Sequence, residues 1–194
     1  MARVRHAVLQ RSSQMLVYSR EEIAPDLYLG VLIDRSGSMG REQKLEKAKA
    51  FAALVTESAK GLRGISGHVT AFDDHTFFRL GDLNHPAIAP LESDEGNNDA
   101  AALSKAAELA LRSGKKNRLL IMISDGSPTE CSVESLRNLV ARLTRRGGFV
   151  CAQVAVDKME EICFPHFVDL SKYPLDEAVG RFGKLLMRLT EAWR

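Results

Sequence analysis

Three oxygen-bearing side chains stand at alternate positions where an apolar segment of this chain ends. Asp34, Ser36 and Ser38 follow the apolar run 27–33, and glycines lie among and after them. Alternation at the end of a strand directs such side chains toward one point in a tight turn. One carboxylate and two hydroxyls are hard ligands with little net charge, a set that suits Mg²⁺ or Mn²⁺ rather than zinc or copper. The spacing therefore predicts a site for a divalent metal.

Two further polar segments are predicted to join this site. Asp125 lies in Ser-Asp-Gly at the end of the apolar run 118–124, and Asn97 and Asp99 lie in Gly-Asn-Asn-Asp at the start of a predicted helix. In open α/β sheets, ligands bind outside the carboxyl ends of the strands, where the strand order reverses. Asp34 and Asp125 each end a predicted buried strand, so both are expected on the same rim of the sheet.

The elements that must position these residues alternate between strands and helices. The pair 67–72 and 76–80 has so short a connection that it is predicted to be an antiparallel hairpin. The alternation predicts an α/β fold, namely a three-layer α/β/α sandwich around a Rossmann-like, mostly parallel sheet with one antiparallel edge strand. Leu62 and Trp193 are among the residues predicted to face inward. The other predicted strands are 27–33, 118–124, 149–156 and 167–170, and the predicted helices are 42–62, 99–112, 133–146 and 175–193.

The three polar segments together resemble the metal-ion-dependent adhesion site (MIDAS) of von Willebrand factor A (vWA) domains, and the likeness extends over about residues 27–190. The resemblance implies that Ser36 and Ser38 bind Mg²⁺ or Mn²⁺ through their hydroxyls. Asp34 and Asp125 would act mostly through bound water. It also implies a protein-binding module and not an enzyme, in which the metal takes a Glu or Asp carboxylate from a partner protein.

The middle loop departs from the family pattern, which usually reads Gly-Thr-x-Thr before small residues and Leu. Here the segment 96–103 reads Gly-Asn-Asn-Asp-Ala-Ala-Ala-Leu. Asn97 takes the usual ligand position and is expected to coordinate through its amide oxygen. Asp99 takes the second threonine position, where it either caps the helix or reaches the metal. Coordination by Asp99 would add charge and lower the affinity of the metal for a partner carboxylate.

This middle loop is similar to that of the intracellular bacterial branch of the family. The branch includes the vWA subunits of cobalt and magnesium chelatases and the nitric-oxide reductase activation proteins, which work beside AAA+ ATPases of the MoxR kind. The resemblance implies an adaptor or assembly subunit with a MoxR-type AAA+ ATPase as a partner.

The composition is that of an ordinary globular domain. Hydrophobic residues make up 45% and charged residues 27%, and the net charge of +2 does not favour nucleic-acid binding. No apolar stretch approaches the roughly 20 residues of a membrane span, and no signal peptide is predicted. Three cysteines without paired spacing are typical of a reducing compartment, so a cytoplasmic location is expected. Residues 1–26 are predicted to be an N-terminal extension or linker, and 27–194 the vWA domain.

Two other classes match parts of the same motif. The segment 36–40, Ser-Gly-Ser-Met-Gly, nearly matches the nucleophile elbow Gly-x-Ser-x-Gly. Asp125 and His166 follow Ser38 in the order of an α/β-hydrolase triad. This alternative predicts a serine hydrolase, but it lacks the first glycine and leaves Asp34 without a role. A phosphate-binding loop at the same helix start ranks third, because the Walker lysine spacing is missing.

Overall fold

A computed structural model describes residues 26–192 of the 194-residue chain except 127 and 146; the side chains of 176, 186 and 188–192 are also outside the description. Most of the predicted extension at 1–26, and the inward position expected for Trp193, therefore fall outside the described residues. Within the described part, the elements follow one another in the predicted order.

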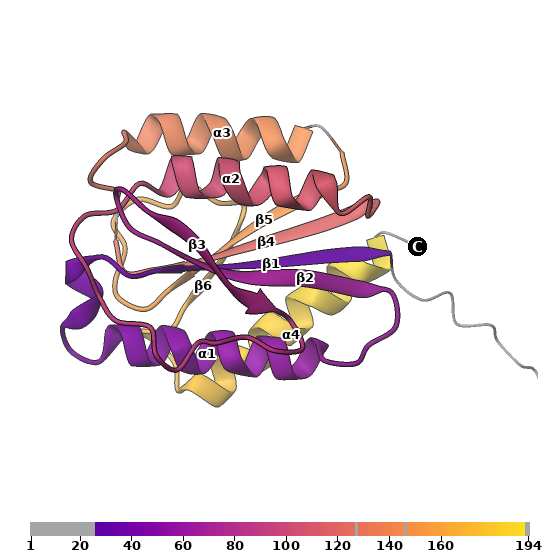
Figure 1. The fold of residues 1–194 in the computed structure, drawn as a ribbon, viewed down its shortest axis with the longest axis horizontal. Helices are drawn as coiled ribbons and strands as arrows, with labels where there is room; N and C mark the ends of the chain where they lie inside the picture. Colours follow the sequence, from indigo (N-terminus) through magenta and orange to yellow (C-terminus); the bar gives the residue numbers. More distant parts are fainter. Residues whose placement is uncertain (1–25, 127, 146, 193–194) are drawn as a thin grey trace, which may run out of the picture.

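Six strands form one sheet in the order β3-β2-β1-β4-β5-β6 (Figure 1). All neighbouring strands are parallel except β2 and β3, which form the predicted antiparallel hairpin at one edge. The α/β fold and its antiparallel edge strand are thereby confirmed. The strands are β1 (Leu27–Asp34), β2 (Ile65–Phe72), β3 (Phe77–Asp82), β4 (Asn117–Ser124), β5 (Phe149–Ala155) and β6 (His166–Asp169).

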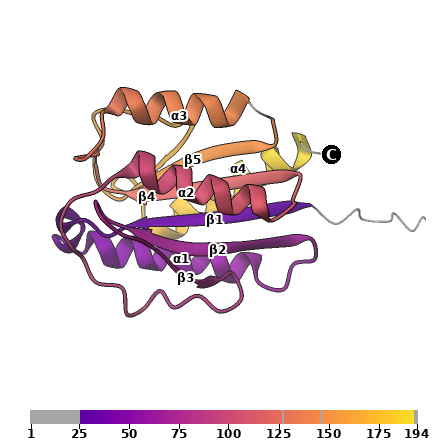
Figure 2. The ribbon, with the colours of Figure 1, turned by 45° about the horizontal axis from the view of Figure 1, so that its top comes forward.

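Helices cover both faces of the sheet, which explains why the central strands are apolar on both sides. Helices α1 and α4 pack on one face and α2 and α3 on the other, and a second direction of view shows the same three layers (Figures 1 and 2). Every residue of β1 is buried. The helices are α1 (Lys44–Ala59), α2 (Asp99–Arg112), α3 (Val133–Arg145) and α4 (Leu175–Ala192), with a short 3-10 helix, η1, at Gly37–Gly40. None of the helices in the described ranges is both long and apolar enough to span a bilayer.

The helix α1 is shorter at both ends than the predicted 42–62. It begins at Lys44 because Glu42 and Gln43 have positive φ values of 51° and 59°, outside the helical region. It ends at Ala59, so the expectation that Leu62 faces inward is wrong: this side chain is 52% exposed. Gly61 and Gly64, which follow α1, have positive φ values of 71° and 82°, so the chain has left the helical conformation on both sides of Leu62.

Strands β1 and β4 are neighbours in the sheet. The strands that follow β1 along the chain extend the sheet to one edge, and those that follow β4 extend it to the other, so the strand order reverses between β1 and β4. Asp34 is the last residue of β1, and Asp125 directly follows β4. The two carboxylates therefore lie at the carboxyl edge of the two central strands, where open α/β sheets bind ligands.

Candidate metal site at the rim of the central strands

Asp34 is a fully buried carboxylate with two protein donors. Its Oδ1 accepts the backbone N–H of Ser36 at 2.8 Å, and its Oδ2 accepts the side-chain amide of Asn97 at 3.2 Å. Burial is the main cause that raises the pKa of Asp34 to about 6; the hydrogen bonds from Ser36 oppose this rise, and the charge of Asp125 adds to it. The two hydrogen bonds thus hold the carboxylate in place, but they only partly offset the cost of burying its negative charge.

The two serines connect Asp34's turn to the loop after β4. The hydroxyl oxygens of Ser36 and Ser38 lie 3.1 Å apart, and the Ser38 hydroxyl donates to Asp125 Oδ1 at 2.9 Å. The second oxygen of Asp125 accepts from Lys44 Nζ at 3.0 Å. The structure therefore brings together Asp34, the two serines and Asp125, as the strand-end pattern predicts.

Asp99 is the carboxylate of the site whose negative charge has the fewest hydrogen-bond partners. It is the first residue of α2 and 1% exposed, and neither of its carboxylate oxygens accepts a hydrogen bond from another residue in the described part of the chain. Burial, and then the charges of Asp34 and Asp125, raise the pKa of Asp99 well above its ordinary value. A buried polar group without a partner is costly. A cation among these carboxylates would remove that cost.

The cap of α2 is Asn98 and not Asp99. The Asn98 side chain accepts the backbone N–H of Ala101 at 3.0 Å, so the capping alternative for Asp99 is wrong. The Asp99 carboxylate thus has no capping role, and the charges of Asp34 and Asp125 act on it. Gly96, three residues before Asp99, has a φ of +64°. A Cβ at this position would lie 2.7 Å from Asp74, so the loop needs glycine there.

Asn97 holds two loops together instead of presenting its amide oxygen to the site. That oxygen accepts the backbone N–H of Thr129 at 2.7 Å and the Thr129 hydroxyl at 3.0 Å, while the Asn97 N–H donates to the same hydroxyl at 3.0 Å. A backbone N–H can only donate, which determines the orientation of the amide. The geometry argues against the predicted coordination by Asn97, whose amide nitrogen instead supports Asp34. Sequence reasoning did not select Thr129, although it stands four residues after Asp125.

Arg35, between the first two motif residues, anchors the loop that precedes Asn97. Its guanidinium pairs with Asp73 at 3.0 Å and with Asp94, and stacks 5.4 Å from the ring centre of Phe78. Burial tends to raise the pKa of Asp73, but hydrogen bonds from Thr76, His75 and Arg35 outweigh it and lower this pKa to about 2. The loop from residue 83 to 98 is thus held against the end of β1 by charged and hydrogen-bonded contacts.

These side chains suit a hard divalent cation by type. In the described part of the chain, no group of three or more His, Cys, Asp or Glu side chains is arranged to hold a metal by itself. A metal here would therefore need the serine hydroxyls as well as the carboxylates. A mixture of hydroxyl, carboxylate and water oxygens is the kind of ligand set that Mg²⁺ and Mn²⁺ accept.

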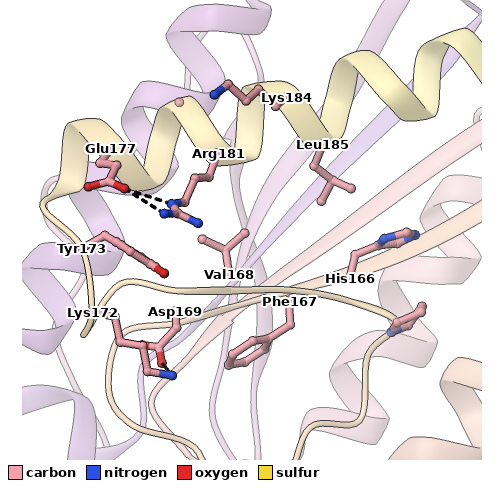
Figure 3. Close-up of a pocket in the computed structure, with 12 residues that line it drawn as sticks. His166, Phe167, Val168, Asp169, Lys172, Tyr173, Glu177, Arg181, Lys184 and Leu185 are labelled. Carbon is pink, nitrogen blue, oxygen red and sulfur yellow. Dashed lines mark hydrogen bonds and ion pairs between the residues drawn. The ribbon is translucent and has the colours of Figure 1, made fainter.

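The structure does not support the serine hydrolase alternative. In a triad, a histidine lies between the nucleophile and the acid, but here the Ser38 hydroxyl donates directly to Asp125. His166 begins β6 at the sheet edge, two strands away from β4. It lies beside a separate groove between β6 and α4 (Figure 3).

This groove has a volume of about 850 Å³ and carries charged side chains that pair with one another. Arg181 pairs with Glu177 at 2.9 Å and lies 3.8 Å from the ring centre of Tyr173, and Lys172 pairs with Asp169 at 2.9 Å (Figure 3). Four of the charged side chains that line the groove are thus paired with one another.

Comparison with known families shows to which protein family this chain belongs. The family model of the von Willebrand factor type A domain matches residues 29–162. The chain belongs to this family. VWA domains commonly mediate protein–protein interactions, and no curated protein matches the chain.

Solved structures confirm the VWA fold at low sequence identity. The PilB minor pilin from Streptococcus sanguinis, as its D319A mutant, has a TM-score of 0.67 at 11% identity over 90% of this chain and 64% of that chain. The SpRpn10 VWA domain has a TM-score of 0.58 at 12% identity over 79% and 94% of the two chains. The ArnB paralog VWA2 from Sulfolobus acidocaldarius has a TM-score of 0.51 at 19% identity over 68% of this chain and 35% of that chain. This VWA chain thus spans only about a third of the archaeal protein.

Proposed function

We propose that this VWA domain binds partner proteins through a Mg²⁺ or Mn²⁺ ion held at the rim of β1 and β4. The observation that carries the proposal is Asp99, a carboxylate 1% exposed whose oxygens accept no hydrogen bond from any other described residue. The charge of a second buried carboxylate, Asp34, helps to raise the pKa of Asp99. Folded proteins seldom retain such a pair without a compensating ligand.

The residues have distinct roles in this proposal. Ser36 and Ser38 supply hydroxyl oxygens, and Asp99 supplies a carboxylate in place of the expected amide oxygen of Asn97. Asp34 and Asp125 act mostly through water, and Asn97 positions Asp34. A bound divalent ion supplies an electrophilic centre that a carboxylate can approach. The partner is therefore expected to present a Glu or Asp side chain.

The finer assignment of the partner rests on the segment from Asn97 to Leu103. Its likeness to the chelatase and nitric-oxide reductase activation branch favours a chelatase-like adaptor that works with a MoxR-type AAA+ ATPase in the cytoplasm. Binding, and not catalysis, is the activity proposed, since VWA domains are generally interaction modules.

Calorimetric titration with Mn²⁺ tests the metal site. Asp34→Ala and Ser38→Ala are expected to lower the affinity about 10- to 100-fold, as loss of metal-supporting groups usually does. Ser58→Ala is the matched control, because this exposed serine on α1 donates its hydroxyl to Leu54 of its own helix and to no other described residue. Thermal unfolding shows whether each variant remains folded. A folded wild-type domain that binds neither Mn²⁺ nor Mg²⁺ at millimolar concentration contradicts the proposal.

Partner capture tests the second half of the proposal. Pull-down of a MoxR-type ATPase is expected in Mg²⁺ and not in EDTA, and is expected to be lost with Ser38→Ala. Capture that persists in EDTA contradicts the role of the metal in binding. Capture that fails in every condition, with metal binding intact, contradicts the choice of partner alone.

A further inference from the structure

Lys44 places an ammonium group on the outer side of the candidate metal site. Its Nζ lies 3.0 Å from Asp125 Oδ2 and 2.7 Å from Asp157 Oδ2, and its side chain is 14% exposed. Asp125 is nearly buried at 5%, whereas Asp157 is 43% exposed. Lys44 is thus shared between a carboxylate inside the site and a more exposed carboxylate, whose charge water screens more strongly.

The local backbone does not favour this position of the lysine. Lys44 is the first residue of α1, where the helix dipole disfavours a positive charge. The two preceding residues, Glu42 and Gln43, both have positive φ although neither is glycine. Residues in such conformations are retained when surrounding structure holds them, and they cluster at functional sites. Here the turn is held by backbone hydrogen bonds from the Lys44 N–H to Arg41 and from the Lys47 N–H to Gln43, together with the contacts of the Lys44 ammonium with the two carboxylates.

The charges of the site explain what this ammonium contributes. With Asp34, Asp99 and Asp125 ionised, a divalent ion leaves the group with one net negative charge, and that charge would repel the carboxylate of a partner. The positive charge of Lys44, which the more exposed Asp157 shares with Asp125, offsets part of that negative charge. Because Asp99 stands where the family usually has a neutral threonine, this site has one more negative charge to offset than the usual site.

We propose that Lys44 is a built-in counter-ion that pairs with Asp125 and so lowers the negative charge of the site, so that the metal-loaded site still accepts an acidic side chain. This inference rests on the proposed metal site. The same charge repels the metal, so Lys44 exchanges metal affinity for affinity toward a carboxylate. Neutral glutamine at this position is expected to shift both affinities, in opposite directions.

Two titrations test the counter-ion. Lys44→Gln is expected to bind Mn²⁺ about threefold or more tightly than wild type, since a nearby positive charge is removed. Acetate, titrated into the Mn²⁺-loaded domain and followed by the relaxation of water protons, is expected to bind about threefold or more weakly. Lys44→Arg keeps the charge and is expected to stay near wild type in both titrations.

A lysine at the other end of α1 provides the control. Lys60→Gln makes the same charge change at an exposed pair with Glu57 and is expected to leave both affinities within about twofold of wild type. Unchanged or weaker Mn²⁺ binding by folded Lys44→Gln overturns the inference, as does unchanged acetate binding. Absence of Mn²⁺ binding by the wild type refutes the metal site itself, so the two failures are distinct.

Discussion

The rim of β1 and β4 and the groove between β6 and α4 differ in the burial and the pairing of their charged side chains. At the rim, Asp34 and Asp99 are almost fully buried, and Asp99 accepts no hydrogen bond from another described residue. In the groove, Arg181 and Glu177 are each about half exposed and pair with one another. The groove has a volume of about 850 Å³, yet the rim is the better candidate for a ligand. Uncompensated charge, and not concavity, marks the site.

The physical reason lies in solvation. A half-exposed ion pair is screened by water and contributes little, so its arrangement reports little about function. A buried carboxylate cannot be solvated, and its charge must be balanced by a proton, a cation or donors. The protein retains Asp99 at a position where a neutral residue would avoid this cost. The comparison therefore predicts large effects at the rim and small ones at the groove.

The largest effect is expected for Asp99→Asn. At pH 8 in EDTA the variant is expected to be more stable than wild type by about 3 kcal/mol, because it removes an uncompensated buried charge. The raised pKa of Asp99 means that its cost to stability grows as pH rises through that pKa and disappears below the ordinary value. The gain is therefore expected to shrink between pH 8 and pH 5. Urea unfolding at each pH measures it.

Bound metal is expected to reverse the order of stability of the wild type and Asp99→Asn. In saturating Mn²⁺ the wild type gains stability from binding, whereas Asp99→Asn gains less because it has lost a proposed ligand. Asp94→Asn provides a control, since Asp94 is exposed and pairs with Arg35 outside the site. A variant that is less stable than wild type in EDTA at pH 8 contradicts the view that Asp99 is uncompensated.

A smaller effect is expected for Thr129→Val. The substitution removes the hydroxyl that accepts the N–H of the buried Asn97, and a buried group left without a partner costs about 1–3 kcal/mol. Mn²⁺ affinity is also expected to fall, because Asn97 supports Asp34. Thr144→Val on α3 is the control, since among the described residues its hydroxyl bonds within its own helix alone. Equal stability of the two variants contradicts the role of Thr129 in joining the loops.

The smallest effect is expected for Arg181→Ala in the groove. Loss of the exposed pair with Glu177 and of the stacking on Tyr173 is expected to cost less than about 1.5 kcal/mol. Mn²⁺ affinity is expected to remain at the wild-type value. If the variant changes metal binding as much as a substitution at Asp99, the division between the two regions does not hold.

Most of the fold could be predicted from the sequence because its signals are local. Continuous apolar runs predict β1 and β4, and the short connection after β2 predicts the antiparallel hairpin. The ends of helices were less predictable. The turn at Glu42 and Gln43 has no local signal in residue type, since neither is glycine, and it shortens α1 at its start.

The sequence by itself determined that oxygen-bearing side chains follow two central strands, and hence that Asp34, Ser36, Ser38 and Asp125 meet at one rim. Only the tertiary structure decided which oxygens are already engaged. The amide oxygen of Asn97 is occupied by Thr129, 32 residues away, and Asp125 pairs with Lys44, 81 residues away. Neither carboxylate oxygen of Asp99 accepts a hydrogen bond from another described residue. Strand ends follow from local pattern, but the partners of a buried polar group come from segments that only folding brings together.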